Sequence, residues 1–114
     1  MIRLHIEVIN GVTVVKYLDR RLLDGGLLYP INQALIELAK PGFRVLIDFE
    51  GVELLSSLAL SGPFELGKCA KDCEGRLAVC NVHPGILEIF EETKLNKLFP
   101  ICENREQALA LLLQ

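Results

Sequence analysis

Two adjacent hydroxyl side chains, those of Ser56 and Ser57, stand where a buried strand is expected to lead into a helix. A hydroxyl can accept a phosphate, and the free N–H groups at a helix N-terminus stabilise a phosphate placed there. Binding sites in open α/β sheets also gather at the carboxyl ends of strands. A serine at this position is, however, a common helix cap. On spacing alone, the cap is the favoured interpretation.

The four cysteines are the other residues with reactive side chains, and their spacing does not favour a metal site. Cys69 and Cys73 are separated by three residues, whereas zinc sites and dithiol motifs usually have a closer pair. Cys80 is separated from that pair by a predicted strand, and Cys102 lies further along the chain. We therefore expect structural or incidental thiols, no metal and no cofactor.

The two histidines also lack the neighbours that catalysis would need. His5 lies within the first predicted strand, and His83 precedes a proline at a strand-to-helix junction. Neither is joined by a nucleophile and a carboxylate in a recognisable motif, and the glycines match no P-loop or dinucleotide fingerprint. We interpret both as satisfied strand or loop histidines. An enzyme or thiol carrier that uses Cys73, Cys80 or His83 is the least favoured hypothesis.

Hydrophobic periodicity predicts five strands and four helices. A hairpin is expected at the start, because the two-residue turn Asn10-Gly11 separates two alternating runs. The dense run Val45-Leu46-Ile47 predicts a central, parallel strand buried on both faces. In chain order, the strands are expected at 4–8, 12–18, 43–49, 77–80 and 100–102, and the helices at 30–39, from after 57 to about 72–75, at 84–92 and at 105–113.

These elements predict an α/β fold in which helices pack on a largely parallel or mixed sheet. Residues 19–26 are polar and end in two glycines, so we interpret them as a loop. Pro30 would then fall near the first turn of the following helix, where its missing N–H costs little. No repeat or linker interrupts the order of the elements, and we expect a single domain over residues 1–114.

Composition excludes several functional classes. The chain has 114 residues, a formal net charge of −3 and scattered basic residues, so direct binding to nucleic acid is not expected. Its apolar runs are much shorter than the roughly 20 residues needed to span a bilayer. The first residues lack the organisation of a signal peptide. We expect a cytoplasmic protein, and the sequence leaves its oligomeric state open.

The segment that contains the two serines, GVELLSSLALS (51–61), resembles the phosphorylation loop of the STAS domain, the family of bacterial anti-sigma factor antagonists. Three later segments are similar to family patterns in the same order: GRLAVCNVHP (75–84), IFEETKLNKLFP (89–100) and NREQAL (104–109). The resemblance covers nearly the whole chain. It implies a four- to five-stranded mixed sheet with helices packed mainly on one face.

The resemblance also implies a non-enzymatic, protein-binding switch. The unmodified domain would bind an anti-sigma factor that is also a serine kinase, phosphorylation would weaken that complex, and a serine phosphatase would restore it. Ser57 corresponds to the phosphorylated serine of the family, with Ser56 as the second choice. The residues expected to contact the partner are Asp48, at the end of a strand near the loop, and Ser56, Ser57, Leu58 and Ser61.

Several residues differ from the family pattern and keep an alternative open. Ser56 replaces an aspartate, and Ala59 and Ser61 replace glycines. An interior Pro63 would cost about 3 kcal/mol, so the helix is expected to start late, with Ser61 as its cap and Ser57 in the loop. The alternative function is a constitutive scaffold or ligand-sensing module without phosphorylation control.

Overall fold

The chain opens with an antiparallel hairpin, as its alternating pattern predicts. The computed structural model, which describes residues 3–114, pairs β1 (Leu4–Ile9) with β2 (Val12–Tyr17). Asn10 and Gly11 join the strands with φ angles of 51° and 84°, both in the left-handed region. A type I′ turn requires positive φ at both central residues, which asparagine and glycine tolerate best. The predicted hairpin is confirmed.

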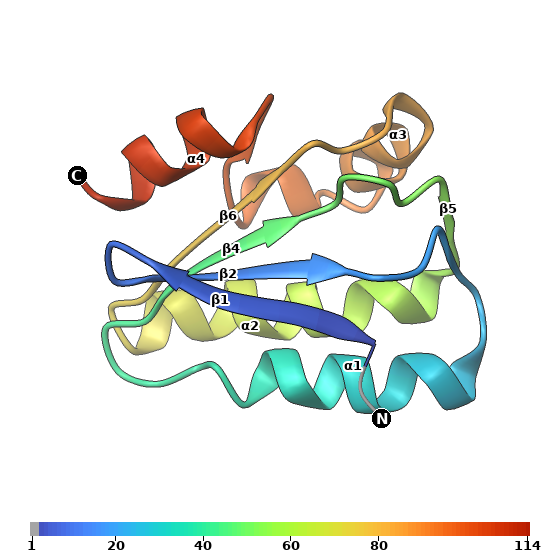
Figure 1. Ribbon diagram of the computed structural model, residues 1–114, viewed down its shortest axis with the longest axis horizontal. Helices are drawn as coiled ribbons and strands as arrows, with labels where there is room; N and C mark the ends of the chain where they lie inside the picture. Colours follow the sequence, from blue (N-terminus) through green and yellow to red (C-terminus); the bar gives the residue numbers. More distant parts are fainter. Residues whose placement is uncertain (1–2) are drawn as a thin grey trace.

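The main sheet has five strands in the order β1-β2-β4-β6-β7 (Figure 1). β4 (Arg44–Asp48) lies at its centre and runs parallel to β2 and to β6 (Arg76–Cys80). β7 (Ile101–Cys102) forms the far edge and is parallel to β6. Every residue of β4 after Arg44 is buried, as expected for a parallel strand covered on both faces. The predicted mixed sheet is confirmed.

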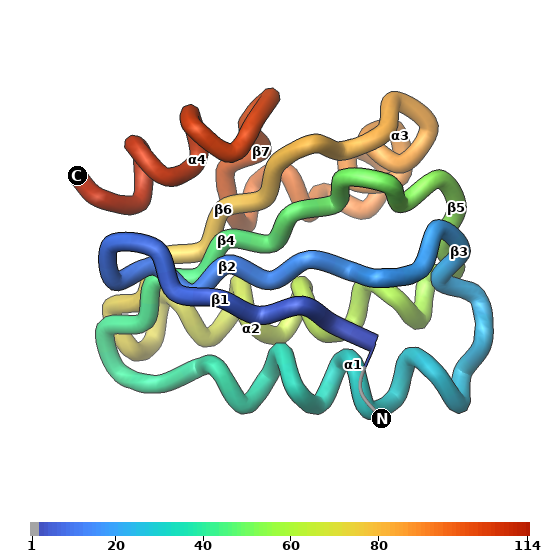
Figure 2. The backbone as a smooth tube through the Cα atoms, in the orientation of Figure 1, coloured from blue at the N-terminus to red at the C-terminus, as the bar shows by residue number. Residues whose placement is uncertain are grey.

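Helices cover the two faces of this sheet unequally. α1 (Gly25–Ile36), α2 (Ser61–Asp72) and α3 (Pro84–Glu92) surround the larger hydrophobic core, whereas α4 (Arg105–Leu112) packs alone over a smaller one. Figures 1 and 2 show α1 and α2 on one side of the strands and α4 on the other. The predicted packing, mainly on one face, is confirmed. No helix within residues 3–114 is long and apolar enough to cross a membrane.

A second, two-stranded sheet lies in part of the segment predicted to be a loop. β3 (Arg21–Leu22) pairs in parallel with β5 (Leu54–Leu55), and Leu22 and Leu55 are both buried. Strands of two residues are too short to produce an alternating pattern, so periodicity could not reveal them. This small sheet joins the segment before α1 to the segment before Ser57.

The start of α1 also differs from the prediction. The helix begins at Gly25, where the side chain of Asp24 accepts a hydrogen bond from the N–H of Gly26 at 2.9 Å. Pro30 therefore lies inside the helix and not near its first turn. Proline has no N–H to donate to the carbonyl four residues earlier. That carbonyl belongs to Gly26, which is exposed, so water can satisfy it.

The hydroxyl of Tyr17 provides a test of the core. It is buried and has no hydrogen-bond partner among the described residues, and burial raises its pKa. An unsatisfied buried hydroxyl costs about 1–3 kcal/mol. We expect Tyr17→Phe to raise the free energy of unfolding by about 1 kcal/mol in urea denaturation. Tyr29→Phe is the control, since Tyr29 is 68% exposed. A marked loss of stability in Tyr17→Phe would contradict this account of the core.

Candidate functional site

Ser57 is positioned by hydrogen bonds between the segment after β4 and the segment before α1. The N–H of Glu53 donates to the carbonyl of Arg20 at 2.8 Å, and that of Ser56 donates to the carbonyl of Leu22 at 3.0 Å. A 3-10 turn, η1 (Ser57–Leu60), begins immediately afterwards and continues directly into α2. Ser57 is exposed, whereas Ser56 is partly buried. The pair β3–β5 thus holds the segment that precedes Ser57, and Ser57 lies at the surface.

Neither serine caps a helix. The Oγ of Ser56 donates to the carbonyl of Leu22 at 3.4 Å and makes no hydrogen bond to the turn that follows. The N-cap position of α2 is occupied by Leu60, which makes no side-chain cap bond. The capping interpretation that spacing favours is therefore wrong, and the hydroxyl of Ser57 is free of that role.

The proline that was expected to delay α2 lies within its first turn. α2 starts at Ser61, so Pro63 is the third helical residue. The first N–H groups of a helix have no partner within the helix, so a proline there removes no internal hydrogen bond. Ser61 belongs to the helix and is not its cap. Ser57 consequently lies in the 3-10 turn and not in an irregular loop.

The side chain of Asn32 fastens this turn to α1. Asn32 is only 5% exposed, its Nδ2 donates to the carbonyl of Leu58 at 2.9 Å, and its Oδ1 accepts from the N–H of Gly62 at 3.1 Å. A Cβ at Gly62 would lie 2.6 Å from that Oδ1. Glycine therefore allows α1 and the start of α2 to approach closely enough for both hydrogen bonds. One amide thus fixes the backbone within η1 and at the start of α2.

This geometry predicts that Asn32→Asp is strongly destabilising at neutral pH. The aspartate would keep an acceptor for Gly62 but would place a carboxylate oxygen against the carbonyl of Leu58. We expect the free energy of unfolding to fall by about 3–5 kcal/mol, the cost of an uncompensated buried charge. Urea denaturation is the measurement. Gln33→Glu adds the same charge at the neighbouring exposed residue, and equal stability of the two variants would refute the role of Asn32.

The surroundings of Ser57 are mainly apolar and partly exposed. Leu54 and Leu58 each expose 46% of their surface, and Phe64 exposes 41%. An open hollow lies beside them, lined by Ser57, Leu60, Ser61, Phe64, Thr93 and Leu95. Together with Leu54 and Leu58, these residues form what we call the Ser57 surface. Of the residues predicted to contact a partner, Ser57 and Ser61 line this hollow. Leu58 is exposed beside Ser57 in the chain, with its side chain near Gly25 at the start of α1, and Ser56 is partly buried.

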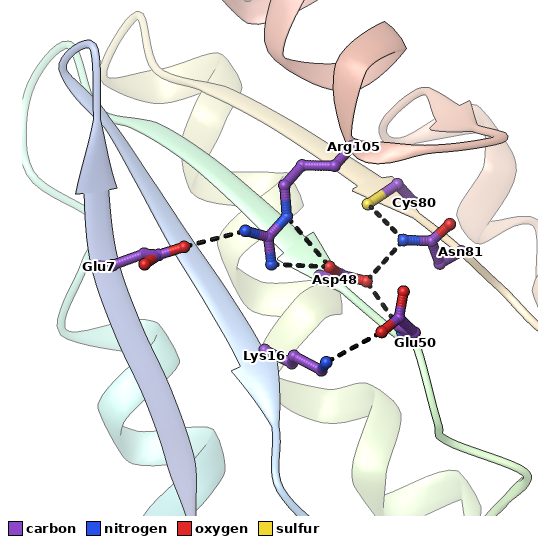
Figure 3. Close-up of polar contacts among 7 residues, drawn as sticks. All are labelled: Glu7, Lys16, Asp48, Glu50, Cys80, Asn81 and Arg105. Atoms are coloured by element: carbon purple, nitrogen blue, oxygen red, sulfur yellow. Dashed lines mark hydrogen bonds and ion pairs between the residues drawn. The ribbon is translucent and has the colours of Figure 1, made fainter.

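Asp48 does not belong to the Ser57 surface. It is 2% exposed and lies on the face of the sheet that α4 covers (Figure 3). Its Oδ2 accepts hydrogen bonds from Arg105 at 2.9 and 3.2 Å, and its Oδ1 accepts from Asn81 and from the backbone N–H of Glu50, both at 2.9 Å. Arg105 also pairs with Glu7 at 2.9 Å. Burial leaves Asp48 no surface for contact with a partner.

The pKa of Asp48 reflects this environment. Burial opposes its ionisation, but hydrogen bonds from Asn81, from the N–H of Glu50 and from Arg105 outweigh that effect and lower the pKa. The carboxylate therefore stabilises the folded protein above its unfolded pKa of about 3.9. That contribution is lost as the pH falls through the folded pKa.

Asp48→Asn keeps the shape of the side chain and removes its charge. We expect a loss of about 1.5–3 kcal/mol in the free energy of unfolding at pH 7, because hydrogen bonds to a charged group are lost. The difference from the wild type should narrow as the pH falls below about 4. Urea denaturation at several pH values measures it, with Asp72→Asn at an exposed site as the control. A pH-independent difference would contradict the assignment.

The cysteines and His83 do not form a common site. Cys73 packs against the larger core, whereas Cys80 lies in the smaller core on the opposite face of the sheet. Burial raises the pKa of Cys80 to about 12, which keeps the thiol protonated. The Nδ1 of His83 accepts a hydrogen bond from the N–H of Gly85 at 3.1 Å and so caps α3, as expected for a satisfied loop histidine. Residues 3–114 contain no cluster of three metal-ligating side chains.

Sequence reasoning missed several residues that shape the Ser57 surface. Asn32 carried a usable signal, because it shares one helical face with the buried residues Leu28 and Leu35. A polar residue on such a face needs a buried hydrogen-bond partner. Thr93 and Leu95 carried no local signal, since only the tertiary fold brings them beside Ser57.

Comparisons with known proteins agree with this architecture. Residues 5–108 match the family model of the STAS domain. A candidate anti-sigma factor antagonist of Bordetella bronchiseptica, BtrV, is 30% identical over 67 residues, which are 59% of this chain and 58% of that protein. The match thus spans less than two thirds of that relative's length.

Solved structures share the fold at low sequence identity. An anti-sigma factor antagonist (STAS) domain protein from Planctomyces limnophilus is 23% identical, with a TM-score of 0.87 over 97% of this chain and 98% of that chain. The anti-sigma factor antagonist SpoIIAA, in its unphosphorylated form, is 13% identical, with a TM-score of 0.67 over 95% and 94% of the two chains. With nearly the whole described chain matched by the family model, this protein belongs to the STAS domain family.

Proposed function

We propose that this protein is an anti-sigma factor antagonist that binds its anti-sigma factor through the Ser57 surface. In this proposal the partner is also a serine kinase, phosphorylation of Ser57 weakens the complex, and a serine phosphatase reverses the modification. The observation that carries the proposal is an exposed serine set among exposed apolar side chains. The relatives BtrV and SpoIIAA, which carry the description of anti-sigma factor antagonists, support the choice of partner.

The composition of the Ser57 surface favours protein binding over catalysis. Its hollow is lined by apolar and hydroxyl side chains and by no charged residue. Interface cores are likewise depleted in charge and rich in aromatic and aliphatic groups. Phe64, whose ring lies under the ammonium group of Lys68 at 5.2 Å from the ring centroid, offers a large apolar contact. A partner that covers Leu54, Leu58 and Phe64 would remove this apolar area from water.

Phosphorylation at Ser57 would weaken the complex because the phosphate would be solvated in the free protein and desolvated in the complex. A phosphoserine carries a charge of about −1.5 to −2 at neutral pH. In the free protein, the exposed position of Ser57 would leave this charge in water. In a complex, the same charge would be covered beside Phe64 in a hollow whose lining contains no charged residue. The ammonium group of Lys68, over the ring of Phe64, is a cation close to this hollow and would offset only part of the desolvation cost. The desolvation cost would fall on the complex alone.

A constitutive binding module is the second candidate, and the residues around Ser57 give it specific support. Ser56 stands where the family resemblance expects an aspartate, and Ala59 and Ser61 stand where it expects glycines. In this case the same apolar surface would bind a partner permanently. The two candidates differ in what a charge at Ser57 does to binding.

Affinity capture from host lysate, with mass spectrometry of the bound proteins, separates the candidates. We expect wild type and Ser57→Ala to retain an anti-sigma factor that contains a kinase domain. Ser57→Glu should reduce its retention on the order of tenfold or more, since an uncompensated buried charge costs at least 1.4 kcal/mol. Ala110→Glu adds an equal charge at an exposed position of α4 and should bind as the wild type does.

Incubation with the same lysate and ATP then locates the phosphate. Mass spectrometry should find it on wild type and on Ser56→Ala, and not on Ser57→Ala. Equal retention of one partner by wild type and Ser57→Glu would support the constitutive module. Phosphate incorporation that is unchanged in Ser57→Ala would exclude Ser57 as the modified residue.

A further inference from the structure

The outer edge of β1 is a second surface equipped for an interaction. β1 is the end strand of the sheet, and no strand of residues 3–114 lies beyond it (Figure 1). Natural edge strands usually carry a lysine, a proline or a bulge that prevents pairing with another chain. Residues Leu4–Ile9 contain no lysine or proline, and their register with β2 is unbroken. This edge therefore lacks those three devices over its six residues, and Glu7 is its one charged residue.

Three residues of β1 direct their backbone groups toward this free edge. The N–H of Leu18 donates to the carbonyl of Arg3 at 3.2 Å, so Arg3 and Leu18 form a hydrogen-bonded pair. Such pairs alternate along an antiparallel hairpin, so every second residue of β1 after Arg3 also bonds to β2. The backbone N–H and C=O groups of Leu4, Ile6 and Val8 consequently point away from β2. A new strand could pair with them without displacing any bond of the sheet.

The side chains of β1 divide into two stripes. Leu4 packs against the larger core, and Ile6 and Val8 follow it on the same face with 47% and 69% of their surface exposed. On the face that α4 covers, His5 is exposed. Glu7, on that same face, accepts a hydrogen bond from Arg105 through Oε1, and its Oε2 has no partner within residues 3–114. The edge thus combines an apolar stripe with one imidazole and one available carboxylate oxygen.

We propose that β1 pairs with β1 of a second copy of this chain, antiparallel, about a two-fold axis at Ile6. In this register Ile6 faces Ile6 of the second copy, and Leu4 faces Val8 in both directions. All three residues have outward-pointing backbone groups, so they form hydrogen-bonded pairs. The two five-stranded sheets become one continuous sheet, and the exposed apolar side chains gain cross-strand contacts with their own copies.

Charge complementarity favours this register over one shifted toward the turn. With Ile6 on the axis, His5 of each copy faces Glu7 of the other, close to its free Oε2. A shift of two residues toward the turn would place the two Glu7 carboxylates opposite each other, which is destabilising. A shift by one residue would place the outward-pointing backbone groups of one copy opposite residues of the other copy whose backbone groups already bond to β2. The occupant favoured by the sequence of this edge is therefore a second copy.

Sedimentation velocity over the micromolar to millimolar range tests the proposal. We expect the wild type to form dimers as its concentration rises. Val8→Lys should raise the dissociation constant on the order of tenfold or more, because each copy brings the new charge into the apolar stripe. Leu113→Lys is the matched control, since Leu113 is an apolar residue of α4's C-terminal end that is 41% exposed. It should dimerise as the wild type does.

Substitutions at the exposed His5 test the register without changing the apolar stripe. His5→Arg keeps a donor opposite Glu7 of the second copy and should retain or strengthen the dimer. His5→Glu opposes two carboxylates at two symmetric positions and should weaken it. A wild type that stays monomeric at millimolar concentration would overturn the proposal. So would a dimer that is indifferent to Val8→Lys and to both changes at His5, since it would use another surface.

Discussion

One amide side chain, that of Asn32, holds the candidate site together. It donates to the carbonyl of Leu58 and accepts from the N–H of Gly62, so it joins the 3-10 turn and the start of α2 to α1. Among common side chains, only an amide offers a donor and an acceptor in this arrangement without a charge. Its burial makes each bond expensive to lose. The position of the Ser57 surface therefore depends on an interaction outside that surface.

The contacts on the two faces of the sheet differ in kind. On the face of α1–α3 the contacts are apolar and extend to the exposed side chains around Ser57. On the face of α4, charged groups act together with the smaller hydrophobic core to hold the helix in place. Arg105 is the first residue of α4, where the helix dipole disfavours a cation. The carboxylates of Asp48 and Glu7 offset that cost and link the last helix to the centre and the edge of the sheet.

Local signals decided which parts of this structure could be predicted from the sequence. The hairpin follows from alternation and from Asn10-Gly11, and α3 has its predicted bounds because a proline starts it at Pro84. The pair β3–β5 could not be predicted, because strands of two residues show no periodicity. Gly25-Gly26 indicated a loop, yet Asp24 caps a helix there.

In the candidate site too, local sequence patterns did not reveal contacts between distant segments. Ser57 was predicted from its neighbours in sequence, but the burial of Asp48 depends on Arg105, which lies 57 residues away. The resemblance placed Asp48 near the phosphorylation loop, and the sequence contains no local sign that its side chain turns toward α4. Similarly, the hollow beside Ser57 includes Thr93 and Leu95, which lie much later in the chain. Such contacts arise only when the sheet brings distant segments together.

The fixed backbone of η1 has a kinetic consequence. Leu58 exposes 46% of its surface while its own carbonyl is held by Asn32. Under the proposed function, a partner that contacts this side chain would meet a turn whose backbone is already fixed, so the turn itself would lose little conformational entropy on association. Among variants of one such preorganised interface, the association rate changes little and the lifetime of the complex changes most. Under the proposed function, phosphorylation of Ser57 on this turn would therefore act mainly on the lifetime of the complex.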